Sequence, residues 1–245
     1  DITPRTGAQM SGFLAREQPS VGIHDPLAAR GLYLNDGRGR LLWLHADLVG
    51  LEREFIGELK KELGDRLGFR SHEIVISATH THSGPATIRL INAGAYDECY
   101  LQTLKKSMME VAESSVNSAG QAVSRYAEGL CDLATDRRRK ASAHTDHHLA
   151  VLTFHRPDGS CLAVLANYPI HNVALRADNR LISADMAGAA AAKVTRELAG
   201  NPVVLMTNGA CGNLNPPAVT SEFIQKYQPV PNYEQMAQWG DRIGD

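Results

Sequence analysis

The sequence predicts an α/β fold in which a mixed β-sheet, or two such sheets, is covered by helices within a single domain. Apolar runs typical of strands alternate with amphipathic stretches of helical period. Some runs pair around tight turns as hairpins, whereas others are separated by segments long enough to hold a crossover helix. No internal repeat or low-complexity linker divides the 245 residues, so we expect one domain over 1–245.

In the first half of the chain, each element follows from its own residue pattern. Two apolar runs around an Asn-Asp-Gly turn predict a hairpin over 30–48. Helices are predicted over 51–67 and 96–119, because each segment places its apolar side chains on one helical face. Between these helices, the apolar stretch 72–79 predicts a strand.

The second half continues the alternation. A Pro-Asp-Gly turn predicts a second hairpin over 148–170, and the stretch 183–200 predicts a helix with Ser183 as its N-cap. A short buried strand is expected to open 201–217 and to run into a loop rich in Gly, Asn and Pro. The last residues, 234–245, have the pattern of a helix without a stop signal, so we expect the chain to continue further.

Composition excludes several classes of function. The formal net charge of −2 offers no basic field for nucleic acid, and no apolar run approaches the ~20 residues that span a bilayer. The four cysteines are widely spaced, which favours free thiols over a disulfide framework. We expect a soluble protein, cytoplasmic rather than secreted, although a chain that opens on Asp1 leaves an upstream targeting segment open. The sequence does not indicate an oligomeric state.

Polar clusters follow three of the predicted strands. His80 and His82 follow the first, His171 follows the second, and the segment 208–213 follows the third. In α/β sheets, ligands bind beyond the carboxyl ends of strands. If the three strands are neighbours, these clusters converge on one pocket.

The pair His80 and His82 can serve three purposes. Residues two apart on an extended chain point the same way, so both rings can face one metal ion. Alternatively, one ring moves a proton, or both only cap the strand, and the spacing alone leaves these interpretations open. His171 is a possible third ligand or a hydrogen-bonded core residue. Asp47 and Asp185 are candidates for orienting a histidine, but a strand-end cap and a helix-dipole partner are the simpler interpretations.

Four motifs resemble those of the neutral/alkaline ceramidase family, in particular its N-terminal catalytic domain. In chain order they are DITP, ATHTHSGP, HNVAL followed by DNRLISADMAG, and NGACGNLNPP, and they cover the chain nearly to Pro217. The resemblance implies a zinc-dependent α/β hydrolase. It implies that His80 and His171 are zinc ligands and that His82 contacts the substrate beside the metal. It also implies that an arginine contacts the reaction centre, with Arg137 the closest match and Arg138 an alternative.

The resemblance fails at the nucleophile. The family has a serine in a G-D-x-S-P-N loop, where this chain has Asn213 and Asn215 at the aspartate and serine positions. An asparagine cannot serve as that nucleophile. The family's remaining zinc ligands, a glutamate and a tyrosine, lie further along than Asp245.

These observations lead to one functional hypothesis and two rivals. The hypothesis is a Zn²⁺-dependent hydrolase that cleaves an amide or ester with a metal-activated water. Its substrate would be a small or lipid-like molecule other than ceramide. His82 would shuttle protons or bind the developing oxyanion, and Asn215 and the loop amides would orient or stabilise the tetrahedral intermediate. The rivals are a metal-dependent lactonase or phosphatase, and a non-catalytic relative that binds a ligand.

Overall fold

The computed structural model describes residues 1–90, 94–138, 144–217 and 232–245. Two larger sheets dominate the fold, and both are mixed, as the sequence predicted. One has the strand order β2-β3-β4, with these strands at Ala29–Asn35, Arg40–Ala46 and Ile74–Ala78. The other has the order β10-β8-β7-β5, with the strands at Val203–Asn208, Cys161–Tyr168, His148–His155 and Val123–Leu130.

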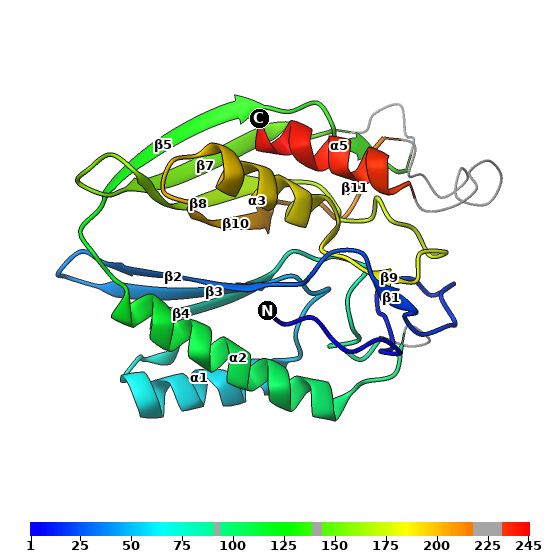
Figure 1. Ribbon diagram of the computed structural model, residues 1–245, viewed down its shortest axis with the longest axis horizontal. Helices are drawn as coiled ribbons and strands as arrows, with labels where there is room; N and C mark the ends of the chain where they lie inside the picture. Colours follow the sequence, from blue (N-terminus) through cyan, green and yellow to red (C-terminus); the bar gives the residue numbers. More distant parts are fainter. Residues whose placement is uncertain (91–93, 139–143, 218–231) are drawn as a thin grey trace.

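The two sheets pack against each other, and helices cover their outer faces (Figure 1). Helices α1 (Arg53–Leu67) and α2 (Glu98–Asn117) lie on the three-stranded sheet. Helices α3 (Asp185–Glu197) and α5 (Tyr233–Gly244) lie on the four-stranded sheet. The protein is therefore a helix–sheet–sheet–helix sandwich, and the predicted α/β class with covered mixed sheets is confirmed.

Side-chain alternation along β3 and β10 explains how these strands pack apolar side chains on both of their faces. On β3, Leu42 and Leu44 join the apolar core under α1 and α2, while Trp43 between them faces the other sheet. On β10, Val204 packs under α3, and Leu205 packs between the sheets. These two strands thus lack the polar face of a half-exposed sheet, because each face has a partner layer.

Several short elements complete the described part of the chain. The bridging pairs β1 with β9 and β6 with β11 lie apart from the large sheets. These four strands are Gly22–Ile23 (β1), Thr135–Asp136 (β6), Leu181–Ile182 (β9) and Leu214–Asn215 (β11). A 3-10 helix, η1, spans Ser71–Glu73. All four cysteines are free thiols, as predicted. None of the described helices combines the length and the apolar character needed to cross a membrane.

The predicted elements are present, with two differences. The strand β5 was missed, because all eight of its residues are exposed and carry no alternating apolar signal. The helix predicted from 183 begins at Asp185, and Ala184 rather than Ser183 occupies its N-cap position. The Ser183 hydroxyl still accepts a hydrogen bond from the Asp185 amide, so the residue helps to begin the helix from one position further out.

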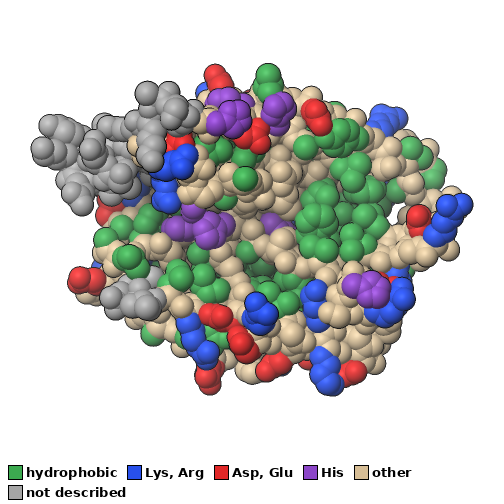
Figure 2. Space-filling view, turned by 180° about the vertical axis from the view of Figure 1, so that it is seen from behind, with side chains coloured by type: hydrophobic (Ala, Val, Ile, Leu, Met, Phe, Trp, Pro, Cys, Tyr) green, Lys and Arg blue, Asp and Glu red, His purple; other side chains and the backbone are tan. Residues whose placement is uncertain are grey.

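A groove of about 920 Å³ opens between the sheets at the end that carries the β2–β3 turn. Leu32, Leu34 and Phe154 contribute to its apolar lining, and none of the three candidate histidines borders it. Figure 2 shows one face of the molecule, on which a patch of apolar side chains and a group of histidines occupy separate areas. This groove and the candidate chemistry are therefore in different places.

Candidate metal centre

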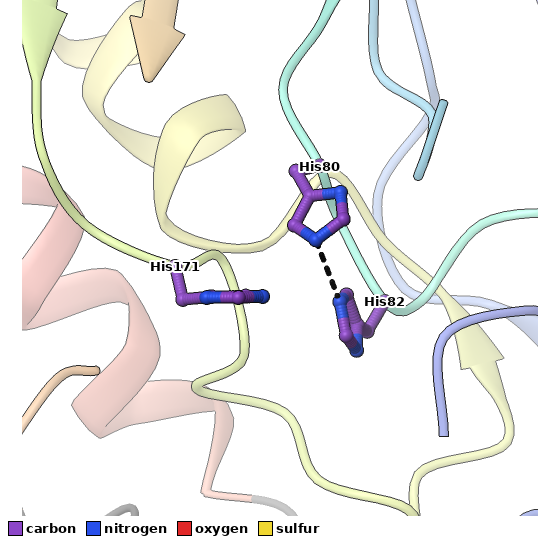
Figure 3. Close-up of side chains that lie close together, drawn as sticks. All are labelled: His80, His82 and His171. Carbon is purple, nitrogen blue, oxygen red and sulfur yellow. Dashed lines mark hydrogen bonds between the residues drawn. The ribbon is translucent and has the colours of Figure 1, made fainter. Parts of the chain in front are cut away.

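Three histidines meet where strands of the two sheets end. His80 and His82 follow β4, and His171 follows β8 (Figure 3). Their ring centroids lie 4.7 Å apart for His80 and His171, 4.8 Å for His80 and His82, and 5.2 Å for His82 and His171. One ligand atom from each lies within 4.8 Å of the others. The three histidines that the sequence singled out therefore lie together, although β4 and β8 belong to different sheets instead of being neighbours in one.

The backbone reaches this arrangement by a route that the sequence pattern did not predict. The chain leaves the strand after Ala78, and His80 adopts a φ of 61° in the left-handed region. The expectation of an extended chain with two parallel side chains is therefore wrong. The rings still converge, because the turn at His80 brings its Nε2 to 3.3 Å from the Nε2 of His82. Such backbone strain is concentrated at functional sites in proteins.

Backbone carbonyls fix the tautomers of two of the rings. His80 Nδ1 lies 2.6 Å from the Val49 oxygen, and His171 Nδ1 lies 3.1 Å from the Cys211 oxygen. A carbonyl only accepts hydrogen bonds, so each Nδ1 carries the proton and each neutral ring has its lone pair on Nε2. This is the arrangement in which metal-binding histidines are commonly held.

The third ring, that of His82, is enclosed by the N-terminal segment. Phe13 meets it edge to face at 4.8 Å between centroids, and a Cβ built on Gly12 would lie 2.4 Å from the Cγ of the ring. The Arg16 guanidinium donates to the backbone oxygens of His82 at 2.6 Å and of Arg176 at 3.0 Å. Among the described residues, the buried Nδ1 of His82 has no hydrogen-bond partner. The residue pattern of this enclosing segment does not predict its place at the site, since nothing in it signals contact with a histidine some 70 positions away.

Burial keeps two of the imidazoles neutral. It lowers the pKa of His82 to about 2, helped by the neighbouring His80 and His171 and by the charges of Arg16 and Arg137. Burial likewise lowers the pKa of His171 to about 4, against the opposing hydrogen bond to the Cys211 oxygen. Neutral imidazole is the form that binds a metal ion.

The donor set fits a zinc ion. Imidazole nitrogens bind Zn²⁺ at about 2.0–2.1 Å, so two of them at the tetrahedral angle lie roughly 3.3 Å apart. The separation of the His80 and His82 Nε2 atoms is 3.3 Å. The same separation also suits a hydrogen bond that His82 donates to His80. The arrangement can hold a metal ion on two or three histidines, or it can pass a proton between His82 and its neighbours.

The glycine- and asparagine-rich loop lies beside His171. The His171 amide donates to the Leu214 oxygen at 2.8 Å, and Asn208 Nδ2 donates to the Ile170 oxygen at 2.8 Å. The clusters that follow β8 and β10 therefore do converge, because these strands are parallel neighbours. Asn215 is buried in the short strand β11, where its backbone oxygen accepts a hydrogen bond from the Thr135 hydroxyl.

The arginine segment is held against the same loop. The Arg137 amide donates to the Asn213 oxygen at 2.9 Å, and the Asn213 side chain donates to the Asp136 carboxylate at 2.7 Å. Arg137 is close enough for its charge to lower the pKa of His82 and of His171. Arg138 instead pairs with Asp136 and is exposed. Of Arg137 and Arg138, Arg137 is thus the one whose charge acts on the histidines.

The two candidate carboxylates have structural partners. Asp47 pairs with Arg30 at 2.8 Å and accepts a hydrogen bond from the Ala28 amide. Asp185 accepts from the amides of Ala174, Leu175 and Met186, and burial raises its pKa to about 6. Asp185 therefore anchors the loop after His171 at the start of α3. The simpler interpretations of both residues agree with these contacts.

The protein is thus a four-layer α/β protein with a candidate histidine metal centre at the ends of its two sheets. The family model described as "Neutral/alkaline non-lysosomal ceramidase, N-terminal" matches residues 1–143 and 99–215. The chain therefore belongs to this family, as the resemblance of its motifs implied.

Known relatives agree with this assignment. The neutral ceramidase of Pseudomonas aeruginosa is 23% identical over 235 residues, covering 84% of this chain and 34% of the relative. That of Drosophila melanogaster is 24% identical over 223 residues, covering 80% of this chain and 31% of the relative. The crystal structure of the Pseudomonas enzyme matches with a TM-score of 0.86 at 20% identity, covering 100% of this chain and 42% of that one. The chain thus spans about a third of the length of these curated relatives.

Proposed function

We propose that this chain forms the zinc-binding part of a ceramidase-like hydrolase that cleaves an amide or ester bond. The observation that carries the proposal is the convergence of His80, His82 and His171, two of them with Nε2 lone pairs fixed by backbone carbonyls. When bound, a zinc ion supplies Lewis-acid chemistry and an activated water. The relatives at 23–24% identity are named neutral ceramidases, which supports a hydrolase with a lipid-like substrate.

In this proposal the histidines have separate roles. His80 and His171 hold the zinc ion through Nε2, because their Nδ1 protons are committed to carbonyl oxygens. His82 lies on the substrate side, where its ring shuttles a proton or donates a hydrogen bond to the developing oxyanion. Its buried Nδ1 faces Gly12, so Nε2, which lies 3.3 Å from the Nε2 of His80, is the nitrogen that serves either role. Arg137 contributes positive charge for an oxyanion that develops near these rings.

The substrate is proposed to differ from ceramide. Asn215 occupies the position of the family's serine, and an amide side chain does not act as a nucleophile. Asn213, at the preceding aspartate position, is engaged by the Asp136 carboxylate. In the proposal, Asn215 and the amides of its loop orient the substrate instead of attacking it. The same substitutions favour the second candidate, a relative that binds a ligand without cleaving it.

Metal analysis of the intact protein tests the proposal. The wild type is expected to retain about one zinc ion per chain, whereas His80→Ala and His171→Ala lose it. His148→Ala is the matched control, because this exposed histidine pairs only with Asp146 in the described contacts. A wild type that binds no zinc, with activity unaffected by His80→Ala, would refute the metal-dependent mechanism.

A panel of amide, ester, lactone and phosphate substrates separates the candidates. Cleavage of amides or esters that is lost in His82→Ala supports the hydrolase. Turnover restricted to lactones or phosphate esters supports the first rival. Uniform inactivity together with tight, zinc-dependent ligand binding supports the non-catalytic relative.

A further inference from the structure

Asn172 is bonded to the segments that carry all three histidines. It directly follows His171, and its backbone oxygen accepts a hydrogen bond from the His82 amide at 3.3 Å. Its side-chain Nδ2 donates to the oxygen of Thr79, the residue before His80, at 2.5 Å. Asn172 is 2% exposed, so water does not compete for these hydrogen bonds.

A third hydrogen bond of Asn172 anchors the cluster to helix α3. The Ala187 amide, in the first turn of α3, donates to the Asn172 Oδ1 at 3.0 Å. The direction of the side-chain amide is fixed by its two partners, since the Thr79 oxygen only accepts and the Ala187 amide only donates. No other side chain of similar size provides both a donor and an acceptor in this geometry, and an aspartate loses the donor.

Asn172 is also where the two histidine segments meet. In the part of the chain that the structure describes, the hydrogen bonds between residues 79–82 and 170–173 both run through it. His80 and His82 come from the end of one sheet, and His171 comes from the end of the other. Packing of the two sheets brings these histidines near each other through apolar contacts, but such contacts are not directional and do not fix the orientation of the rings. Hydrogen bonds at Asn172 add the directional constraint that a metal centre requires.

We propose that Asn172 is a positioning residue of the candidate metal centre, and that it sets the spacing between His171 and the pair His80 and His82. This inference rests on the proposed function, because it concerns how the three rings are presented to a zinc ion. Asn172 does not touch the ion or the substrate in this role. It acts through its hydrogen bonds to the backbone of Thr79 and His82 and through its peptide bond to His171.

Asn172→Asp in the intact protein tests the inference against Asn179→Asp as a matched control. Asn179 is equally buried and also uses its whole side-chain amide, donating to Ser83 Oγ and the Leu181 oxygen and accepting from the Leu181 amide and the Tyr233 hydroxyl. Its bond to Ser83 reaches the residue after His82, but none of these bonds reaches the segment of His171, so Asn179 does not join the two histidine segments. The two variants make the same chemical change, so a thermal unfolding curve for each metal-free protein calibrates their general loss of stability.

The main readouts are the affinity for Zn²⁺ and the visible spectrum of the Co²⁺-loaded protein. Asn172→Asp is expected to weaken zinc binding about 10- to 100-fold, which is the usual effect of losing a partner that orients metal ligands. It is also expected to shift the Co²⁺ bands, while Asn179→Asp leaves both close to wild type. Should Asn172→Asp fail to fold, Asn172→Ala removes both side-chain bonds without adding a charge and carries the same expectation.

The outcomes are distinguishable. If the wild type binds neither ion, the proposed function fails before Asn172 is tested. If the wild type binds zinc and Asn172→Asp binds it equally well with an unchanged Co²⁺ spectrum, the positioning role is overturned. Equal weakening in Asn172→Asp and Asn179→Asp also overturns it, because the effect then reflects general loosening of the fold.

Discussion

Gly12→Ala is expected to displace the His82 ring. Gly12 has a φ of 113°, and a Cβ added there would lie 2.4 Å from Cγ, 2.6 Å from Nδ1 and 2.8 Å from Cβ of His82. Non-bonded carbon atoms are comfortable at about 3.5–4.0 Å, so the ring or the segment must move by roughly 1 Å. The positive φ adds a backbone strain of about 1–3 kcal/mol.

The two effects can be separated with Gly7→Ala. Gly7 has a similar φ of 94°, but a Cβ there would have no atom within 4 Å. Both variants should therefore lose a similar backbone contribution to the free energy of unfolding, measured by urea titration. Only Gly12→Ala should impair the site, because a displacement of about 1 Å can cost on the order of 100-fold in rate.

The assay compares kcat and zinc content in the two variants. We expect Gly12→Ala to lower kcat about 100-fold while it retains its zinc, since His80 and His171 are untouched. Gly7→Ala should keep the wild-type kcat. Equal kcat values in the two variants would show that the N-terminal segment does not hold His82 in place, and the reasoning would be refuted.

Three further predictions concern stability. His45 is buried between the sheets, donating from Nε2 to the Met206 oxygen, and its burial lowers its pKa to about 4. Between this value and the unfolded pKa of about 6.5 the unfolded chain binds more protons, so stability falls as pH falls. Urea titrations of the metal-free protein at pH 7.5 and pH 5 measure how much the free energy of unfolding falls between these two pH values. In His45→Gln this fall should be smaller than in the wild type by about 2 kcal/mol. Leu205→Ala should lower the free energy of unfolding by about 2–5 kcal/mol in a urea titration, because Leu205 is fully buried between the sheets. As a control, Leu130→Ala on the exposed edge strand should change it by less than about 0.5 kcal/mol. Zinc should raise the melting temperature of the wild type and leave that of His171→Ala unchanged, which a calorimetric scan would reveal.

Much of the fold was predictable, because most of its elements carry a local periodic signal. The hairpins and the helices on the first sheet appear where their apolar residues repeat at the spacing of strands or helices. The strand β5 gave no such signal, since an edge strand exposed on both faces needs no apolar alternation. Its place depends on the backbone hydrogen bonds that β7 offers it, which no local pattern records.

The candidate site was predictable in its residues and not in its geometry. His80, His82 and His171 stood out because each follows an apolar run, and the ceramidase-like motifs separated their expected roles. The backbone conformation of His80 was not predictable, because its φ of 61° follows from its surroundings and not from the identity of the residue. Arg16 and Asn172 were missed for a similar reason, since their contacts depend on segments that are remote along the chain.

The sequence by itself determined which residues alternate along strands, which residues line one face of a helix, and which family the chain resembles. Only the tertiary structure decided that the histidines converge from two different sheets, with their Nδ1 atoms held by the Val49 and Cys211 carbonyls. The physical reason is the range of the interactions. Periodicity reflects burial within a single element, whereas a metal centre depends on distances set by the packing of layers and by buried hydrogen bonds between them.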